Sequence, residues 1–163
     1  MGRPDLPAAP GVARHPPPDA STPPSMPTVR ATRRVHFSSA HRLYRPDWSE
    51  ERNQEVFGDC SNPEWHGHNY ELYVTVEGPV DPETGYVMDL KLLKQALNER
   101  VVDDVDHRNL NTQVSWMEGV NPTTENFVVA IWRRLEDHLP EGVGLAGIRL
   151  EETARNSVEY FGD

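Results

Sequence analysis

The stretch His68-Asn69-Tyr70-Glu71-Leu72-Tyr73-Val74-Thr75-Val76-Glu77-Gly78 decides the fold, because its side chains alternate in character. Successive side chains of a β-strand point to opposite faces, so an extended chain places one set of apolar residues on a single side. That set comprises Tyr70, Leu72, Val74 and Val76. A period of two predicts a strand with one buried face and one polar face.

The segments on either side of this strand also carry strand and turn signals. Residues 29–40 mix apolar and polar side chains in a strand-like way, and residues 46–58 form a short, charged insertion with helical character. Turn residues crowd 78–85, so residues 86–88 are expected to return as a partner strand. Residues 147–153 and 157–161 predict a closing hairpin around Ala154-Arg155-Asn156.

Two amphipathic helices are predicted between these strands. Asp89 stands where an N-cap belongs, and the apolar residues after it recur at helical spacing: Leu90, Leu93, Leu97 and Val101. Residues 121–125 contain a hydroxyl cap for a second helix, which ends at Pro140 and has a similar apolar side: Val128, Ile131, Trp132, Leu135 and Leu139. This order of elements predicts an α+β domain, with helices packed on one face of a sheet.

The first 28 residues differ in composition from the rest. Nine of the fifteen prolines lie between Pro4 and Pro27, and large apolar residues are scarce there. We expect residues 1–28 to be a disordered, proline-rich extension and residues 29–163 to be one domain. The extension can be read as a docking tail, as a transit peptide or as an extension without function, and we favour the last reading.

Composition limits the class of protein. The formal net charge of −10 argues against a nucleic-acid binder that neutralises phosphates. The mean hydropathy of −0.69 and the lack of a long apolar run argue against a membrane span or a secretory signal. A single cysteine cannot form an internal disulfide, which fits a reducing compartment. We therefore expect a cytoplasmic protein.

The decapeptide Cys60–Asn69 holds a candidate metal site. His66 and His68 are separated by one residue, so on a strand they point to the same face and can bind one ion together. Gly67 between them allows another group to approach the backbone closely. A third imidazole can come from His36 or His41, which would face opposite sides of an uninterrupted strand, so spacing alone leaves both open. Nitrogen ligands favour zinc.

Cys60 has two functional readings. Beside a histidine site, a thiol can act as a fourth ligand that closes a structural metal centre, or as a base in a catalytic one. Asp106 and His107 follow the first predicted helix, and a thiol with an imidazole and a carboxylate is a recurring set for thiol activation. The alternative role of Asp106 and His107 is to cap the helix end.

Together these motifs resemble the 6-pyruvoyltetrahydropterin synthase family. The resemblance runs from Val29 to the C-terminus and is carried by five segments in order: Phe37-Ser38-Ser39-Ala40-His41-Arg42-Leu43, Cys-x5-His-Gly-His-Asn from Cys60, Asp106-His107-Arg108-Asn109-Leu110, Pro122-Thr123-Thr124-Glu125-Asn126 and Glu152-Thr153. It implies the T-fold, in which a four-stranded antiparallel sheet has two helices on one face. It also implies a homohexamer built as a dimer of trimers.

The resemblance also implies roles for individual residues. His41, rather than His36, would bind zinc with His66 and His68. Cys60 would be the catalytic base or acid, completed by Asp106 and His107 from a neighbouring subunit. Glu152 would anchor a pterin ring in preference to Glu151, while Thr123 and Thr124 would line the pterin pocket and Glu125 would support the turn.

The activity that the resemblance implies is a lyase reaction. The substrate would be 7,8-dihydroneopterin triphosphate, with Mg²⁺ as an optional companion of its phosphates, and the product 6-pyruvoyltetrahydropterin. The spacing of five residues between Cys60 and His66 and the long insertion at 42–59 favour that product over the 6-carboxytetrahydropterin of queuosine biosynthesis. Two further alternatives are a non-catalytic, zinc-stabilised pterin-binding oligomer and a zinc-hydroxide hydrolase.

Overall fold

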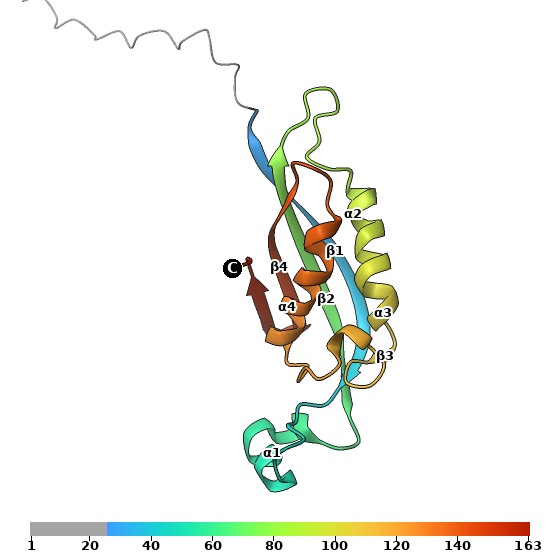
Figure 1. The fold of residues 1–163 in the computed structure, drawn as a ribbon, viewed down its shortest axis with the longest axis vertical. Coiled ribbons are helices and arrows are strands. Elements are labelled where there is room, and N and C mark those ends of the chain that lie inside the picture. The colour runs from blue at the N-terminus through green and yellow to red at the C-terminus, as the bar shows by residue number, and fades with distance from the viewer. Residues whose placement is uncertain (1–25) are drawn as a thin grey trace, which may run out of the picture.

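A computed structural model of the chain describes residues 26–163. Disorder is expected for residues 1–28. Residues 1–25 of this extension lie outside the described part, and Thr28 already belongs to the first strand, where it pairs with Pro79. Two long strands, β1 (Thr28–His41) and β2 (His66–Pro79), run antiparallel side by side through the centre of the molecule (Figure 1). The strand predicted from the alternation in residues 68–78 is confirmed. Each of its four alternating apolar side chains is at most 1% exposed.

The sheet has five strands in the order β3-β1-β2-β4-β5. Strands β4 (Gly144–Thr153) and β5 (Asn156–Tyr160) form the predicted closing hairpin, and β4 pairs antiparallel with β2. The expected four-stranded antiparallel sheet is incomplete as a description. The two-residue strand β3 (Arg108–Asn109) adds a parallel pairing with Ser39 and Ala40 of β1, which makes the sheet mixed.

The prediction of a strand at residues 86–88 is wrong. These residues belong to a loop between β2 and α2, and the amide of Asp81 donates to the carbonyl of Tyr86 across 2.8 Å. The alternation of a three-residue run is too short to specify pairing, and β2 already has β1 and β4 on its two sides.

Helices α2 (Leu90–Leu97) and α4 (Thr124–Leu135) lie on one face of the sheet, as predicted (Figure 1). Helix α2 continues through a π-helical turn at Asn98–Val102 into α3 (Asp103–Val105). Single 3₁₀ turns follow at Ser115–Met117 and Glu136–His138. The apolar helix side packs on the sheet to form the core, which includes Leu93, Leu97, Val101, Val128, Ile131 and Leu135.

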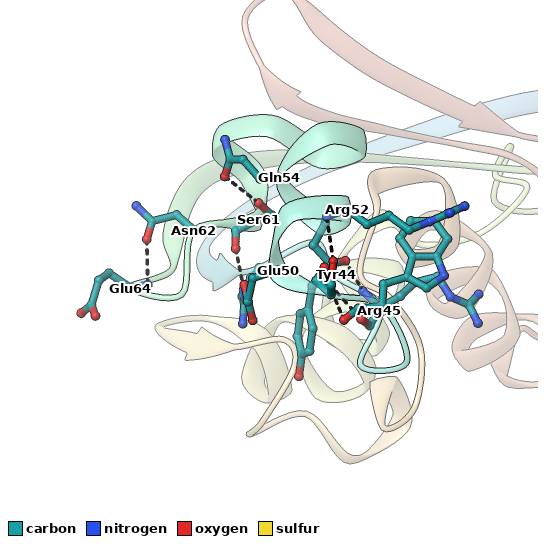
Figure 2. Close-up of polar contacts among 12 residues, drawn as sticks. Tyr44, Arg45, Glu50, Arg52, Gln54, Ser61, Asn62 and Glu64 are labelled. Atoms are coloured by element: carbon teal, nitrogen blue, oxygen red, sulfur yellow. Dashed lines mark hydrogen bonds and ion pairs between the residues drawn. The ribbon is translucent and has the colours of Figure 1, made fainter.

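An excursion between β1 and β2, residues 42–65, stands away from the body of the molecule (Figure 1). It contains α1 (Glu50–Phe57) and a 3₁₀ turn at Gly58–Ser61, so the helical character expected for the insertion is confirmed. Asn53 is buried, accepts a hydrogen bond from the Arg45 amide (2.8 Å) and donates to the Arg45 carbonyl (3.0 Å). Figure 2 shows two more contacts in the excursion, from Ser61 to Gln54 and from the Glu64 amide to Asn62.

In residues 26–163, no helix combines the length and apolar character needed to cross a membrane.

Candidate active site

Three imidazoles converge where β1 ends and β2 begins. The antiparallel register places His41 directly opposite His66, while His68 lies opposite Ser39. The ring centroid of His41 is 4.5 Å from that of His66 and 5.1 Å from that of His68. One nitrogen from each ring lies within 4.8 Å of the others, which is close enough for a single metal ion.

The environment of these rings suits a metal. Nδ1 of His41 lies 2.9 Å from the carbonyl oxygen of Pro122, which can only accept, so Nδ1 carries the proton and Nε2 is left for an ion. Nε2 of His41, both ring nitrogens of His66 and Nε2 of His68 are buried without a hydrogen-bond partner in the described chain. Buried polar atoms are seldom left unpaired, and an ion would pair them.

The pKa values of His41 and His66 favour the neutral rings that a cation binds. The pKa of His41 is lowered to about 4, chiefly by burial, with a smaller contribution from the neighbouring rings. Burial also lowers the pKa of His66. Because a metal binds the neutral ring, protonation of His41 does not compete with binding near neutral pH.

Strand geometry explains why His41 belongs to the cluster. His36 is exposed on the opposite face of β1, opposite Glu71, whereas His41 is 1% exposed. The close approach predicted at Gly67 is present, because a Cβ at this residue would stand 3.0 Å from the carbonyl oxygen of Ser39. The residue before the histidine pair, Trp65, has a φ of 67°, which is uncommon outside glycine and costs energy.

Glu152 adjoins the imidazole cluster. Its Oε1 lies 3.7 Å from Nε2 of His41 and 3.7 Å from Nε2 of His68. The same oxygen accepts a hydrogen bond of 3.0 Å from the hydroxyl of Thr124, at the start of α4. Glu151 instead pairs with Arg149 at 2.8 Å.

A cavity of about 560 Å³ brings four of the predicted site residues together: Cys60, Thr123, Thr124 and Glu152. Thr123 also caps α4, because its hydroxyl accepts the amide hydrogen bond of Asn126. Glu125 lines the same cavity from the first turn of α4. Cys60 and Glu152 therefore line the same cavity, and Glu152 also lies beside the imidazoles.

Cys60 is held through its backbone. Its carbonyl accepts a 2.8 Å hydrogen bond from the Leu43 amide, and the next carbonyl, that of Ser61, accepts a 2.6 Å hydrogen bond from the guanidinium of Arg42. Burial, with Glu152 and Asp59 as nearby negative charges, raises the pKa of the Cys60 thiol. A thiol with a raised pKa is protonated near neutral pH, so it needs a proton acceptor to act as a base.

Asp106 and His107 lie elsewhere in the chain. Oδ1 of Asp106 is 3.0 Å from Nδ1 of His107 and accepts a 2.9 Å hydrogen bond from the Ser38 amide, the main cause of the lowered pKa of Asp106. His107 is 82% exposed and adopts a φ of 57°. It lines a separate cavity of about 430 Å³ at the β3 side of the sheet. His68 lines this cavity together with His107, whereas Cys60 lines the other cavity.

Comparisons with known proteins show which family the chain belongs to. The sequence model of 6-pyruvoyl tetrahydropterin synthase matches residues 30–163. The chain belongs to the 6-pyruvoyl tetrahydropterin synthase family. A 6-pyruvoyl tetrahydrobiopterin synthase of Pongo abelii is 46% identical over 135 residues, which are 83% of this chain and 92% of that protein. The Homo sapiens protein of the same name is 45% identical, with the same coverage.

A solved structure of the Caenorhabditis elegans 6-pyruvoyl tetrahydropterin synthase has a TM-score of 0.79 and 38% sequence identity to this chain. It covers 85% of this chain and 99% of the worm chain. The similarity therefore extends over nearly all of the described fold, and every predicted site residue lies within the family match. Membership in the pterin synthase family confirms the resemblance seen in the sequence.

Sequence reasoning missed three contributors to the site. The carbonyl of Pro122 orients His41, and Arg42 holds the carbonyl beside Cys60. Arg155 lines the same cavity as Cys60 and Glu152, from the turn between β4 and β5. No sequence signal separates Arg155 from ordinary turn residues, and Pro122 stands out only as part of the 122–126 segment, without a role of its own. Arg42 follows a candidate ligand directly, which is a weak positional signal.

Proposed function

We propose that the chain is a zinc-dependent lyase that converts 7,8-dihydroneopterin triphosphate to 6-pyruvoyltetrahydropterin with elimination of triphosphate. The observation that carries the proposal is the placement of Glu152, which lines one cavity with Cys60 and lies 3.7 Å from two imidazoles of the three-histidine cluster. This placement supports a site in which a proton-transfer group, a ring-binding carboxylate and a metal would lie side by side.

His41, His66 and His68 would hold the metal. Three neutral nitrogen ligands with an open fourth position are typical of catalytic zinc, and the buried, unpartnered nitrogens of the cluster fit that donor set. The sulfur of Cys60 is outside the group of mutually close ligand atoms, which supports a base over a fourth ligand. When bound, zinc would act as a Lewis acid that polarises the hydroxyl groups of the substrate side chain.

Glu152 and Thr124 would bind the pterin ring. A carboxylate can accept two parallel N–H hydrogen bonds, such as those of a ring N–H beside an amino group. The hydroxyl of Thr124 donates to Oε1 and fixes the carboxylate, and the cap role of Thr123 fixes the helix start beside it. The ring would thereby be oriented with its side chain toward the imidazoles and Cys60.

Cys60 would take the proton from a side-chain carbon and return one elsewhere. Because burial raises the pKa of the thiol, a second group must accept the thiol proton before the carbon-bound proton is removed. His107 is suited to this role, since Asp106 stands 3.0 Å from its Nδ1 and leaves Nε2 to exchange protons. The triphosphate then leaves with its bridging oxygen as the C–O bond breaks.

His107 would reach Cys60 from a second copy of the chain. The two residues line different cavities in one protomer, and the imidazole of His107 is largely exposed. A symmetric oligomer, such as the hexamer that the sequence resemblance implies, would bring the His107 of one copy to the Cys60 of another.

Incubation of zinc-loaded protein with dihydroneopterin triphosphate, followed by mass analysis, tests the proposal. A product with a three-carbon diketo side chain and free triphosphate is the expected result. A 6-carboxy product would instead favour the queuosine-type alternative, against which the spacing from Cys60 to His66 argues. Unchanged substrate would refute catalysis and leave a zinc-stabilised pterin-binding oligomer.

A further inference from the structure

We propose that Glu152 is also a ligand of the metal when no substrate is bound, so that one carboxylate closes the metal site at rest and binds the ring during the reaction. The inference depends on the metal site of the proposed function. It adds a resting-state role to a residue that the proposed function assigns to the pterin ring alone.

The position of the carboxylate supports this role. Two ligands that each stand about 2.1 Å from one ion at a tetrahedral angle are about 3.4 Å apart. Oε1 of Glu152 is 3.7 Å from Nε2 of His41 and from Nε2 of His68. The oxygen therefore stands near the separation expected for ligands that share an ion, as far as His41 and His68 are concerned. Glu152 is outside the group of three histidines whose ligand atoms all lie within 4.8 Å of one another, so the carboxylate would shift toward the rings when it binds the ion. Nε2 of His41 and Nε2 of His68 are also among the buried nitrogens that lack a partner.

The charge of the carboxylate points the same way. Glu152 is 19% exposed, and within residues 26–163 the only basic groups inside 4.0 Å are His41 and His68. Unlike a lysine or an arginine, neither imidazole carries a fixed positive charge that would neutralise Glu152. Arg155 lines the same cavity without reaching ion-pair distance of Glu152. A mostly buried anion without a cation is unfavourable, and a divalent ion at the imidazoles would neutralise it.

Thr124 would hold the carboxylate in this arrangement. Its hydroxyl donates to Oε1, the oxygen nearest the imidazoles, and a metal-bound carboxylate is commonly supported by such a hydrogen bond. A pterin ring that donates N–H hydrogen bonds to Glu152 would compete with the ion for the carboxylate oxygens. The carboxylate would then move away from the ion. Recognition of the ring would then be coupled to the opening of a metal position.

Visible absorption of the Co²⁺-loaded protein tests the inference, because Co²⁺ accepts the same donors and its bands report its ligands. The variants are Glu152→Gln, which keeps the shape of the side chain, and Glu151→Gln as a matched control. Glu151 loses the same charge but pairs with Arg149 instead of the imidazoles. We expect the d–d bands of the wild type and E151Q to coincide, and those of E152Q to shift. Circular dichroism verifies that both variants fold.

Two additions sharpen the result. Imidazole, a neutral competitor, should change the E152Q spectrum at a concentration about tenfold lower than the wild type requires. Pterin itself, which lacks the side-chain hydroxyls, should change the wild-type bands by drawing Glu152 away. Identical spectra for wild type and E152Q, with stoichiometric Co²⁺, would overturn this inference and leave the proposed function intact. Failure to bind Co²⁺ at all would instead count against the metal site itself.

Discussion

The hydroxyl of Thr124 donates a 3.0 Å hydrogen bond to Oε1 of Glu152 and so joins the first residue of α4 to the end of β4. The contact links two segments that lie 28 residues apart in sequence. It also places the helix start beside the imidazole cluster, since the same carboxylate oxygen is 3.7 Å from two of the rings.

Removal of this hydroxyl should weaken substrate binding more than turnover. In Thr124→Val, Glu152 loses a hydrogen bond to a charged group, which is worth about 1.5–3 kcal/mol. We expect KM for the pterin substrate to rise by roughly tenfold or more, with a smaller change in kcat. Thr124→Ser keeps the donor and should remain near the wild type, as steady-state kinetics can verify. Equal KM values for T124V and T124S would mean that the hydroxyl does not orient Glu152.

Removal of the thiol should show whether Cys60 acts as a base or as a metal ligand. In Cys60→Ala we expect zinc content and oligomeric state to be retained, while kcat falls by about 10²–10⁴, the usual worth of a positioned acid or base. Elemental analysis and turnover measurements decide the point. Loss of zinc with loss of stability would identify a closed structural site, and retained activity would favour a metal-bound hydroxide as the reactive group.

Two inactive variants should restore each other if the site is shared between copies. Cys60→Ala and His107→Ala are each expected to be inactive, because each lacks one half of the proton path. After the two are unfolded and refolded together, about one quarter of the sites should contain both intact residues if copies mix at random. Activity near that fraction is the expected outcome. Hybrid oligomers that are verified by native mass spectrometry and remain inactive would contradict a shared site.

The metal-free protein should lose stability as pH falls from about 6.5 to about 4. Burial lowers the pKa of His41 to about 4 in the folded protein, so in this window the unfolded chain binds a proton that the folded chain does not. The stabilisation is complete above pH 6.5 and is lost progressively toward pH 4, with a maximum of roughly 3 kcal/mol. Urea unfolding across this range measures it. His41→Asn should flatten this part of the profile, and an unchanged profile in H41N would assign the effect to other groups.

The buried amide of Asn53 should matter for the Cys60 segment. Asn53→Ala leaves the amide and carbonyl of Arg45 without their side-chain partner, and each of these hydrogen bonds is worth about 0.5–1.5 kcal/mol. We expect faster hydrogen exchange at the Leu43 amide, which bonds to the Cys60 carbonyl, together with lower kcat. Asn62→Ala, an exposed amide in the same excursion, is the control. Equal exchange rates in the two variants would show that Asn53 does not hold this segment.

Local pattern was sufficient for most elements of the fold. Alternation predicted β2, helical spacing predicted α2 and α4, and turn residues predicted the β4–β5 hairpin. These signals are reliable because each depends on neighbours within one strand or one or two helical turns. The run at residues 86–88 failed because three residues carry too little alternation, and β3 was missed because a two-residue strand has no pattern of its own.

The sequence by itself determined that His66 and His68 share one face, since that depends only on the geometry of a strand. Spacing alone leaves His36 and His41 open. The resemblance favours His41, and the register between β1 and β2 places His41 opposite His66. Only the tertiary structure decided that Glu152 stands beside the rings and that His107 and Cys60 line different cavities. These relationships join residues far apart in the chain, and they are set by strand pairing and packing, which no local spacing encodes.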